Sequence, residues 1–179
     1  MHPFTFTTVK TVISESGSSA RLGEIAAGLG ITRALIVTDP GIVKFGLLEP
    51  ALASLQAASI PVTIYSDVVA DPPEAKVLDS LQLARDAGID GVIGLGGGSS
   101  MDVAKVIALL TNSAQTLREV YGVGNARGAR LPLIQVPTTA GTGSEVTPIA
   151  IITTGETTKT GIVSPLLYAD VALLDADLT

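Results

Sequence analysis

Three consecutive glycines, Gly96-Gly97-Gly98, are the residues of this sequence whose type and spacing point most directly to chemistry. They follow an apolar run at residues 91–95 and precede a segment of helical character that opens with Ser99. Glycine lets the backbone turn sharply and approach a ligand, and the free N–H groups at a helix start favour an anion. We therefore expect a nucleotide pyrophosphate at this turn.

The same turn also has a purely structural interpretation. Ser99-x-x-Asp102 has the spacing of a capping box, which closes a helix start without any ligand. Three glycines directly after a buried strand exceed what capping needs, so phosphate binding is favoured. The stretch departs from the G-x-G-x-x-G fingerprint, because Ser99 stands where the last glycine belongs, and no Gly-Lys-Ser/Thr follows as in a P-loop.

A second polar stretch, residues 137–148, is dense in hydroxyl groups and glycines. Its backbone N–H and side-chain O–H groups can donate to phosphate, ribose or adenine without adding charge. The alternative is an ordinary loop whose Ser and Thr side chains satisfy one another. The stretch follows a predicted strand, so it should lie at the same sheet edge as the glycines, which favours ligand contact.

Short apolar segments alternate with helical segments along the chain, which predicts the elements that position these two loops. Strands are expected at residues 5–14 (a strand or hairpin arm), 34–38, 61–65, 91–95 and 133–136. Helices are expected from a cap at residues 16–19 through 27, and at 47–58, 74–87 and 98–110. This alternation predicts an α/β, Rossmann-like, mostly parallel sheet with helices on both faces and ligands at the carboxyl ends of the strands.

Composition restricts the class of protein. A hydrophobic content of 46% over 179 residues suits one compact domain, residues 1–179, with a buried sheet. A net charge of −6 without any Lys/Arg cluster argues against nucleic acid. The lack of cysteine excludes disulfides and thiolate chemistry, and no apolar run reaches spanning length, so we expect a cytoplasmic protein with no membrane partner.

The two loops together carry a family resemblance. Gly96-Gly97-Gly98-Ser99-x-x-Asp102-x-x-Lys105 and Pro137-Thr138-Thr139-Ala140-Gly141-Thr142-Gly143-Ser144-Glu145-Val146-Thr147 closely resemble the N-terminal domain of the iron-containing (group III, metal-dependent) alcohol dehydrogenases. The resemblance runs from about residue 34 to residue 175, and the second motif is the more specific. It implies an α/β domain that binds NAD(P), and an all-helical C-terminal domain that holds a divalent metal, often iron, through one Asp and three His. Hydride would pass between the nicotinamide and an alcohol or carbonyl carbon polarised by that metal.

The resemblance also implies which residues contact the cofactor. They are Asp39, Gly97, Gly98, Ser99, Asp102, Thr138, Thr139, Thr142, Thr147 and Lys159. The two glycines and Ser99 would meet the pyrophosphate, and Asp102 would line the side of the nicotinamide ribose. The threonines would surround the adenine and phosphate portion. Lys159 would reach a cofactor ribose, although taken alone it is typical of a solvated strand lysine.

Asp39 carries the expectation about cofactor identity. It stands at the end of the strand at residues 34–38, where a carboxylate can accept hydrogen bonds from both adenosine ribose hydroxyls of NAD. The same carboxylate would repel the 2′-phosphate of NADP, so NAD is favoured over NADP. The alternative is that Asp39 only caps the turn at Pro40-Gly41.

The resemblance predicts a partial enzyme. Residues 175–179 stand where the family's helical domain would begin, and the only histidine, His2, is expected at the surface and not as a ligand. We therefore expect an NAD-binding half without the metal site, inactive alone towards alcohols. In the full enzyme the partners would be NAD(H) and a small alcohol, aldehyde or ketone, and a homodimer is an assembly that the sequence allows. A maleylacetate reductase or glycerol dehydrogenase-like relative, and a stand-alone nucleotide-binding or assembly module, remain alternatives.

Overall fold

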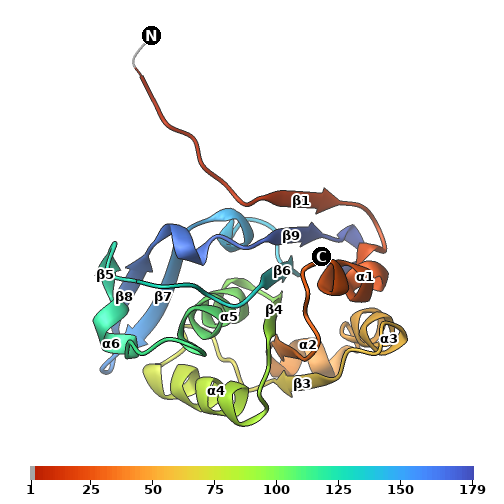
Figure 1. Ribbon diagram of the computed structural model, residues 1–179, viewed down its shortest axis with the longest axis horizontal. Helices are drawn as coiled ribbons and strands as arrows, with labels where there is room; N and C mark the ends of the chain where they lie inside the picture. Colours follow the sequence, from red (N-terminus) through yellow and green to blue (C-terminus); the bar gives the residue numbers. More distant parts are fainter. Residues whose placement is uncertain (1–2) are drawn as a thin grey trace.

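The computed structural model describes residues 3–179, which fold around a six-stranded parallel sheet (Figure 1). His2 lies outside the described residues. In spatial order the strands are β1 (Thr11–Ser14), β9 (Val171–Leu174), β6 (Leu133–Pro137), β4 (Gly91–Gly96), β2 (Ala34–Val37) and β3 (Val62–Tyr65). The central strands β2, β4 and β6 are buried along their whole length, as near-continuous apolar runs in a parallel sheet require.

Helices cover both faces of this sheet, so the predicted α/β, Rossmann-like architecture is confirmed. They are α1 (Leu22–Gly28), α2 (Pro40–Lys44), α3 (Glu49–Ala57), α4 (Glu74–Asp86), α5 (Gly98–Leu110) and α6 (Leu117–Val120). Side chains alternate along each strand, so Leu35 and Val37 of β2 pack in the core on the side of α4 and α5. Ala34 and Ile36 pack in the core beneath α1, α2 and α3.

A second, three-stranded sheet packs on the outer side of α5 (Figure 1). It comprises β5 (Gly122–Val123), β8 (Thr158–Val163) and β7 (Ile149–Thr154), and β7 and β8 form an antiparallel hairpin. Ala150 and Ile152 of β7 are buried while Ile149 and Ile151 are partly exposed, which is the alternation of a half-covered strand. With a sheet on either side, α5 is buried over nearly its whole length.

The predictions about the N-terminal segment are confirmed only in part. Only Thr11–Ser14 form a strand, and it pairs in parallel with β9 instead of forming a hairpin arm. The predicted cap at residues 16–19 is also absent, because the carboxylate of Asp175 accepts hydrogen bonds from the N–H groups of Gly17 and Ser19, each at 2.8 Å. A short 3-10 helix, η1 (Ser18–Arg21), therefore precedes α1.

Short 3-10 helices also occur in later connections: η2 (Ser144–Val146), η3 (Pro165–Leu167) and η4 (Ala176–Leu178). Across residues 3–179, no helix combines the length and the apolar character needed to cross a bilayer. The cytoplasmic location and the homodimer stay predictions.

Candidate functional site

The two loops singled out from the sequence lie against each other at the carboxyl edge of the main sheet. A Cβ placed on Gly97 would lie 3.7 Å from Cγ2 of Thr139, and one on Gly98 would lie 3.3 Å from Cγ2 of Thr142. The backbone N–H of Thr138 donates to the carbonyl of Gly96 at 3.0 Å. The juxtaposition expected from strand order is therefore observed.

The start of α5 has no side-chain cap. Gly97 is the N-cap residue, so Ser99 and Asp102 both lie inside the helix, and the capping box considered as the structural alternative does not form. Gly96 adopts φ +150°, and a Cβ there would lie 2.8 Å from Oγ of Ser100, so this position needs glycine. The first N–H groups of α5 therefore point away from the helix without a side-chain acceptor, which is the arrangement that favours an anion.

A cavity of about 470 Å³ opens in front of this helix start. It is lined by Asp39, Pro40, Val68, Val69, Ala70, Gly97, Gly98, Ser99 and Ser100. These residues follow β2, β3 and β4, three neighbouring parallel strands, at their carboxyl ends. Ligands in open α/β sheets bind at this edge, so position and lining both suit a nucleotide.

Asp39 caps a helix with one carboxylate oxygen and faces the glycine turn with the other. Its Oδ1 caps α2, accepting from the N–H groups of Gly41 at 2.9 Å and Ile42 at 3.2 Å. Its Oδ2 is turned towards the glycine turn, 3.3 Å from where a Cβ on Gly96 would lie. Pro40-Gly41, expected as a turn, is thus the first turn of a short helix, because Asp39 and Pro40 are favourable at N-cap and N1.

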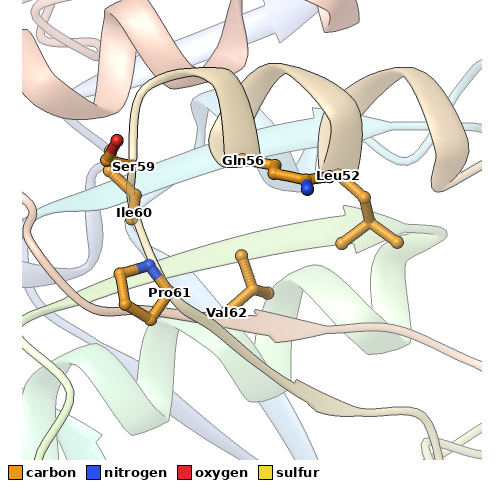
Figure 2. A pocket seen from close by; sticks show the side chains of 6 residues that line it. All are labelled: Leu52, Gln56, Ser59, Ile60, Pro61 and Val62. Carbon is orange, nitrogen blue, oxygen red and sulfur yellow. The ribbon is translucent and has the colours of Figure 1, made fainter.

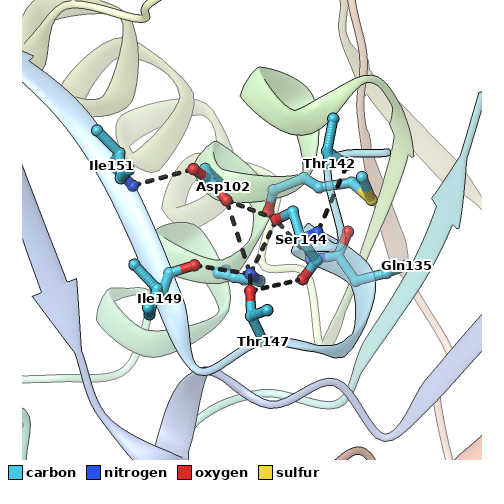
Figure 3. Close-up of polar contacts among 9 residues, drawn as sticks. Asp102, Gln135, Thr142, Ser144, Thr147, Ile149 and Ile151 are labelled. Atoms are coloured by element: carbon cyan, nitrogen blue, oxygen red, sulfur yellow. Dashed lines mark hydrogen bonds and ion pairs between the residues drawn. The ribbon is translucent and has the colours of Figure 1, made fainter. Parts of the chain in front are cut away.

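A polar network ties α5 to the loop at residues 138–148 and to β7 (Figure 3). Oδ1 of Asp102 accepts from Oγ of Ser144 at 2.6 Å, and Oδ2 accepts from the N–H of Ile151 at 3.0 Å. Thr147 lies beside the same cluster, and its Oγ1 accepts from Nζ of Lys105 at 3.3 Å. Asp102 is therefore engaged within the chain, as is one of the predicted threonines.

Lys105 is the residue of this network to which the sequence gave no role. Its side chain is fully buried, and Nζ donates to Oγ of Ser144 at 2.9 Å and to the carbonyl of Ile149 at 2.7 Å. Nζ also lies 3.6 Å from Oδ1 of Asp102. Burial lowers the pKa of Lys105 to about 8, against the opposing charges of Asp102 and Glu145. The spacing Asp102-x-x-Lys105 was the one available signal of this pair.

Lys159 belongs to neither of the two loops and lies on the hairpin of the second sheet. It stands on β8, is more than half exposed, and its Nζ pairs with Oδ1 of Asp71 at 2.6 Å. The pair joins the hairpin to the loop before α4. The structure thus brings most of the predicted residues to the carboxyl edge, whereas Lys159 is placed on the second sheet.

A cluster of metal ligands is not found in the described part of the chain. Among residues 3–179, no three His, Cys, Asp or Glu side chains converge, so their donor set does not fit a divalent metal.

A shallow apolar hollow of about 440 Å³ lies where α3 ends and β3 begins (Figure 2). Its lining residues, Leu52, Gln56, Ser59, Ile60, Pro61 and Val62, include no titratable side chain.

Comparison with known proteins agrees with this geometry. Residues 10–176 match the family model described as iron-containing alcohol dehydrogenase. A sulfoacetaldehyde reductase of Bilophila wadsworthia is 34% identical over 177 residues, which make up 98% of this chain and 46% of that protein.

Solved structures give the same result. A crystal structure of 1,3-propanediol oxidoreductase superposes with a TM-score of 0.95 at 31% identity, covering 99% of this chain and 47% of that one. Sulfoacetaldehyde reductase from Bifidobacterium kashiwanohense, solved in complex with NAD+, superposes with a TM-score of 0.87 at 29% identity, covering 100% and 48%. This chain therefore spans slightly less than half the length of each of these relatives.

Proposed function

This chain belongs to the iron-containing alcohol dehydrogenase family, and from that premise we propose that residues 1–179 form its dinucleotide-binding domain. The ligand is NAD(H), bound at the carboxyl edge of the main sheet. The observation that carries the proposal is the uncapped start of α5, which opens into the cavity shared with Asp39. When bound, the nicotinamide supplies the hydride acceptor or donor for an alcohol or carbonyl substrate.

The pyrophosphate is assigned to the glycine turn. The N–H groups that follow Gly97 and the positive end of the α5 dipole stabilise its negative charge. Gly97 and Gly98 leave space for the phosphates, because a Cβ on either would project towards Thr139 or Thr142. These two exposed threonines lie beside the glycine turn, and their hydroxyls can donate to the same ligand.

The adenosine ribose is assigned to Asp39. Oδ2 is on the side of the glycine turn, so it can accept from a ribose hydroxyl while Oδ1 continues to cap α2. A 2′-phosphate at that place would be repelled at a cost of about 1–3 kcal/mol, which is roughly one to two decades in affinity. The NAD preference therefore depends on the charge of one carboxylate.

The test compares NADH and NADPH titrations of the parent chain with those of Asp39→Asn. Asparagine caps a helix as well as aspartate does, so this variant removes the charge and keeps α2 in place. We expect the parent to favour NADH roughly tenfold or more, and the variant to lose most of that preference. Asp90→Asn is the matched control, because Asp90 caps the N–H groups of Thr32 and Arg33 far from the cavity.

Two results would count against this assignment. A parent chain that binds neither dinucleotide would contradict the proposed function as a whole. A parent that binds NADH but shows the same preference after Asp39→Asn would contradict only the role of Asp39. The alcohol or carbonyl substrate, the divalent metal and the assembly of the full protein stay predictions from the family.

A further inference from the structure

Lys105 is the largest fully buried side chain in the described part of the chain. It stands two helical turns after the start of α5, on the side that faces the loop at residues 138–148 and β7. None of the cofactor contacts proposed above uses it. A fully buried ammonium group requires an explanation, because removing a charge from water costs free energy that ion pairs and hydrogen bonds must offset.

We propose that Lys105 is a positioning residue for the dinucleotide site, whose ammonium group fixes the loop at residues 138–148 against α5. This inference rests on the proposed function, since it assigns the lysine a role in binding the same ligand. Lys105 acts through Ser144, Thr147 and Ile149 and does not itself touch the cofactor.

The hydrogen-bond count supports this role. An ammonium group has three donors, and Nζ uses them on Oγ of Ser144 at 2.9 Å, Oγ1 of Thr147 at 3.3 Å and the carbonyl of Ile149 at 2.7 Å. All three acceptors follow Thr139 and Thr142 in the chain: Ser144 and Thr147 lie in the connection between β6 and β7, and Ile149 is the first residue of β7. The lysine therefore holds the C-terminal part of the loop at residues 138–148, and the N-terminal part of the same loop contacts the glycine turn.

The charges and the burial of the ammonium group set the direction in which the loop responds to pH. Asp102, on α5 itself, lies 3.6 Å away, and Glu145, on η2, also acts on it by charge. From β7 the contact is the carbonyl of Ile149, which is a neutral acceptor. These charges do not offset burial, so the closed loop binds the proton of Lys105 less tightly than a released loop with a hydrated lysine would.

An exclusively stabilising role is disfavoured by the same geometry. A buried ion pair contributes little net stability compared with apolar side chains of similar volume. Methionine is close to lysine in length and would fill the space without desolvating a charge. The presence of lysine at this position is therefore better explained by a role in fixing one conformation of the loop than by a contribution to stability.

The test uses Lys105→Met in the purified 179-residue chain, with NADH affinity followed by fluorescence titration. Loss of charged hydrogen bonds that hold the loop should weaken NADH binding by roughly tenfold near pH 7. In the parent, NADH affinity should rise about fivefold as the pH goes from about 7 to about 9, because the closed loop binds the proton of Lys105 less tightly than a released loop does, so deprotonation favours the closed loop. In Lys105→Met this pH dependence should vanish. Lys76→Met is the control, since Lys76 pairs with Asp67 on the surface and should behave as the parent.

A second measurement needs no variant and no cofactor. Amide hydrogen exchange in the parent, corrected for intrinsic rates, should show residues 139–149 gaining protection between about pH 7 and about pH 9, while α4 keeps its protection unchanged. A parent that binds NADH with the same affinity at both pH values, or a folded Lys105→Met that retains the parent's affinity, would overturn the positioning role. A parent that does not bind NADH would instead overturn the proposed function, and the positioning role with it.

Discussion

A buried charge near the amino edge of the main sheet is fully paired, whereas a buried charge on the carboxyl side is not. At the amino edge, Asp170 precedes β9 and its carboxylate accepts from Nζ of Lys10 at 2.6 Å, a guanidinium N–H of Arg130 at 2.5 Å and the N–H of Leu133 at 3.0 Å. On the carboxyl side, the ammonium group of Lys105 has only Asp102 as a near counter-charge, at 3.6 Å. At the amino edge the buried carboxylate is satisfied by donors of the same chain, whereas at the carboxyl edge the start of α5 has no side-chain cap.

The pKa values of these two groups move accordingly. Burial opposes ionisation of Asp170, but hydrogen bonds from Arg130 and Lys10 outweigh it and lower the pKa of Asp170 to about 2. For Lys105 burial is the larger effect, and the pKa falls to about 8. The charge of Asp170 therefore stabilises the fold, whereas the charge of Lys105 costs stability. The difference shows that ion pairing at the amino edge stabilises the fold, and it is consistent with our proposal that the carboxyl edge binds the dinucleotide.

The largest expected effect is on stability, at the amino edge. Asp170→Asn would leave Arg130 largely buried without its counter-charge, so the free energy of unfolding near pH 7 should fall by about 3 kcal/mol. NADH affinity should stay unchanged. The parent should lose the same contribution as the pH falls from 3.8 towards about 2, because a lowered carboxyl pKa stabilises only above that window.

Urea unfolding measures this prediction, with Asp67→Asn as the control. Asp67 is exposed and pairs with Lys76 at 3.6 Å, so its loss should cost less than about 1 kcal/mol. Equal losses in the two variants would show that the amino edge has no special part in stability.

The next effect is on binding, at the carboxyl edge. Gly98→Val would place a branched side chain where the pyrophosphate approaches α5, so NADH affinity should fall by roughly tenfold to a hundredfold. Folding should survive, because the nearest atom to the new Cβ is the end of the exposed Thr142 side chain, at 3.3 Å. Gly28→Val, with no neighbour within 4 Å of its Cβ and far from the cavity, is the matched control. An unchanged NADH titration in folded Gly98→Val would return the glycine turn to a structural role.

The smallest effect is the alkaline dependence of stability. Since the pKa of Lys105 drops from 10.5 to about 8 on folding, the unfolded chain binds more protons between these values, and stability gains with rising pH there. Lys105→Met should lack this gain. Comparison of parent and variant by urea unfolding between about pH 7.5 and about pH 9.5 checks the sign. A difference that does not change with pH would mean that Lys105 is not the titrating group.

The sequence allowed much of the fold to be predicted, because burial periodicity is local. The apolar runs that became β2, β4 and β6 and the glycine turn before α5 could be located from neighbouring residues alone. The pairing of β1 with β9 could not, because it joins residues such as Thr11 and Val171 that are far apart in the chain.

The site was predictable in part, for the same reason. Asp39 and the glycines were found because each directly follows a strand. The capping box failed because Asp102 bonds to Ser144 and Ile151 instead of the start of its own helix. Lys105 received no role because its acceptors belong to the connection between β6 and β7 and to the start of β7, a strand that the sequence analysis did not anticipate.

The most direct test of the account is to map NADH binding onto the two edges by NMR chemical-shift changes in the parent chain. A dinucleotide site at the start of α5 predicts a saturable titration. The amide chemical shifts of Gly97, Gly98 and Ser99 should change most, followed by those of the loop at residues 138–148. The amides around Arg130 and Asp170 at the amino edge should stay still. Saturable shifts centred on the amino edge, or no shifts at all, would contradict the claim that the open start of α5 is a dinucleotide site.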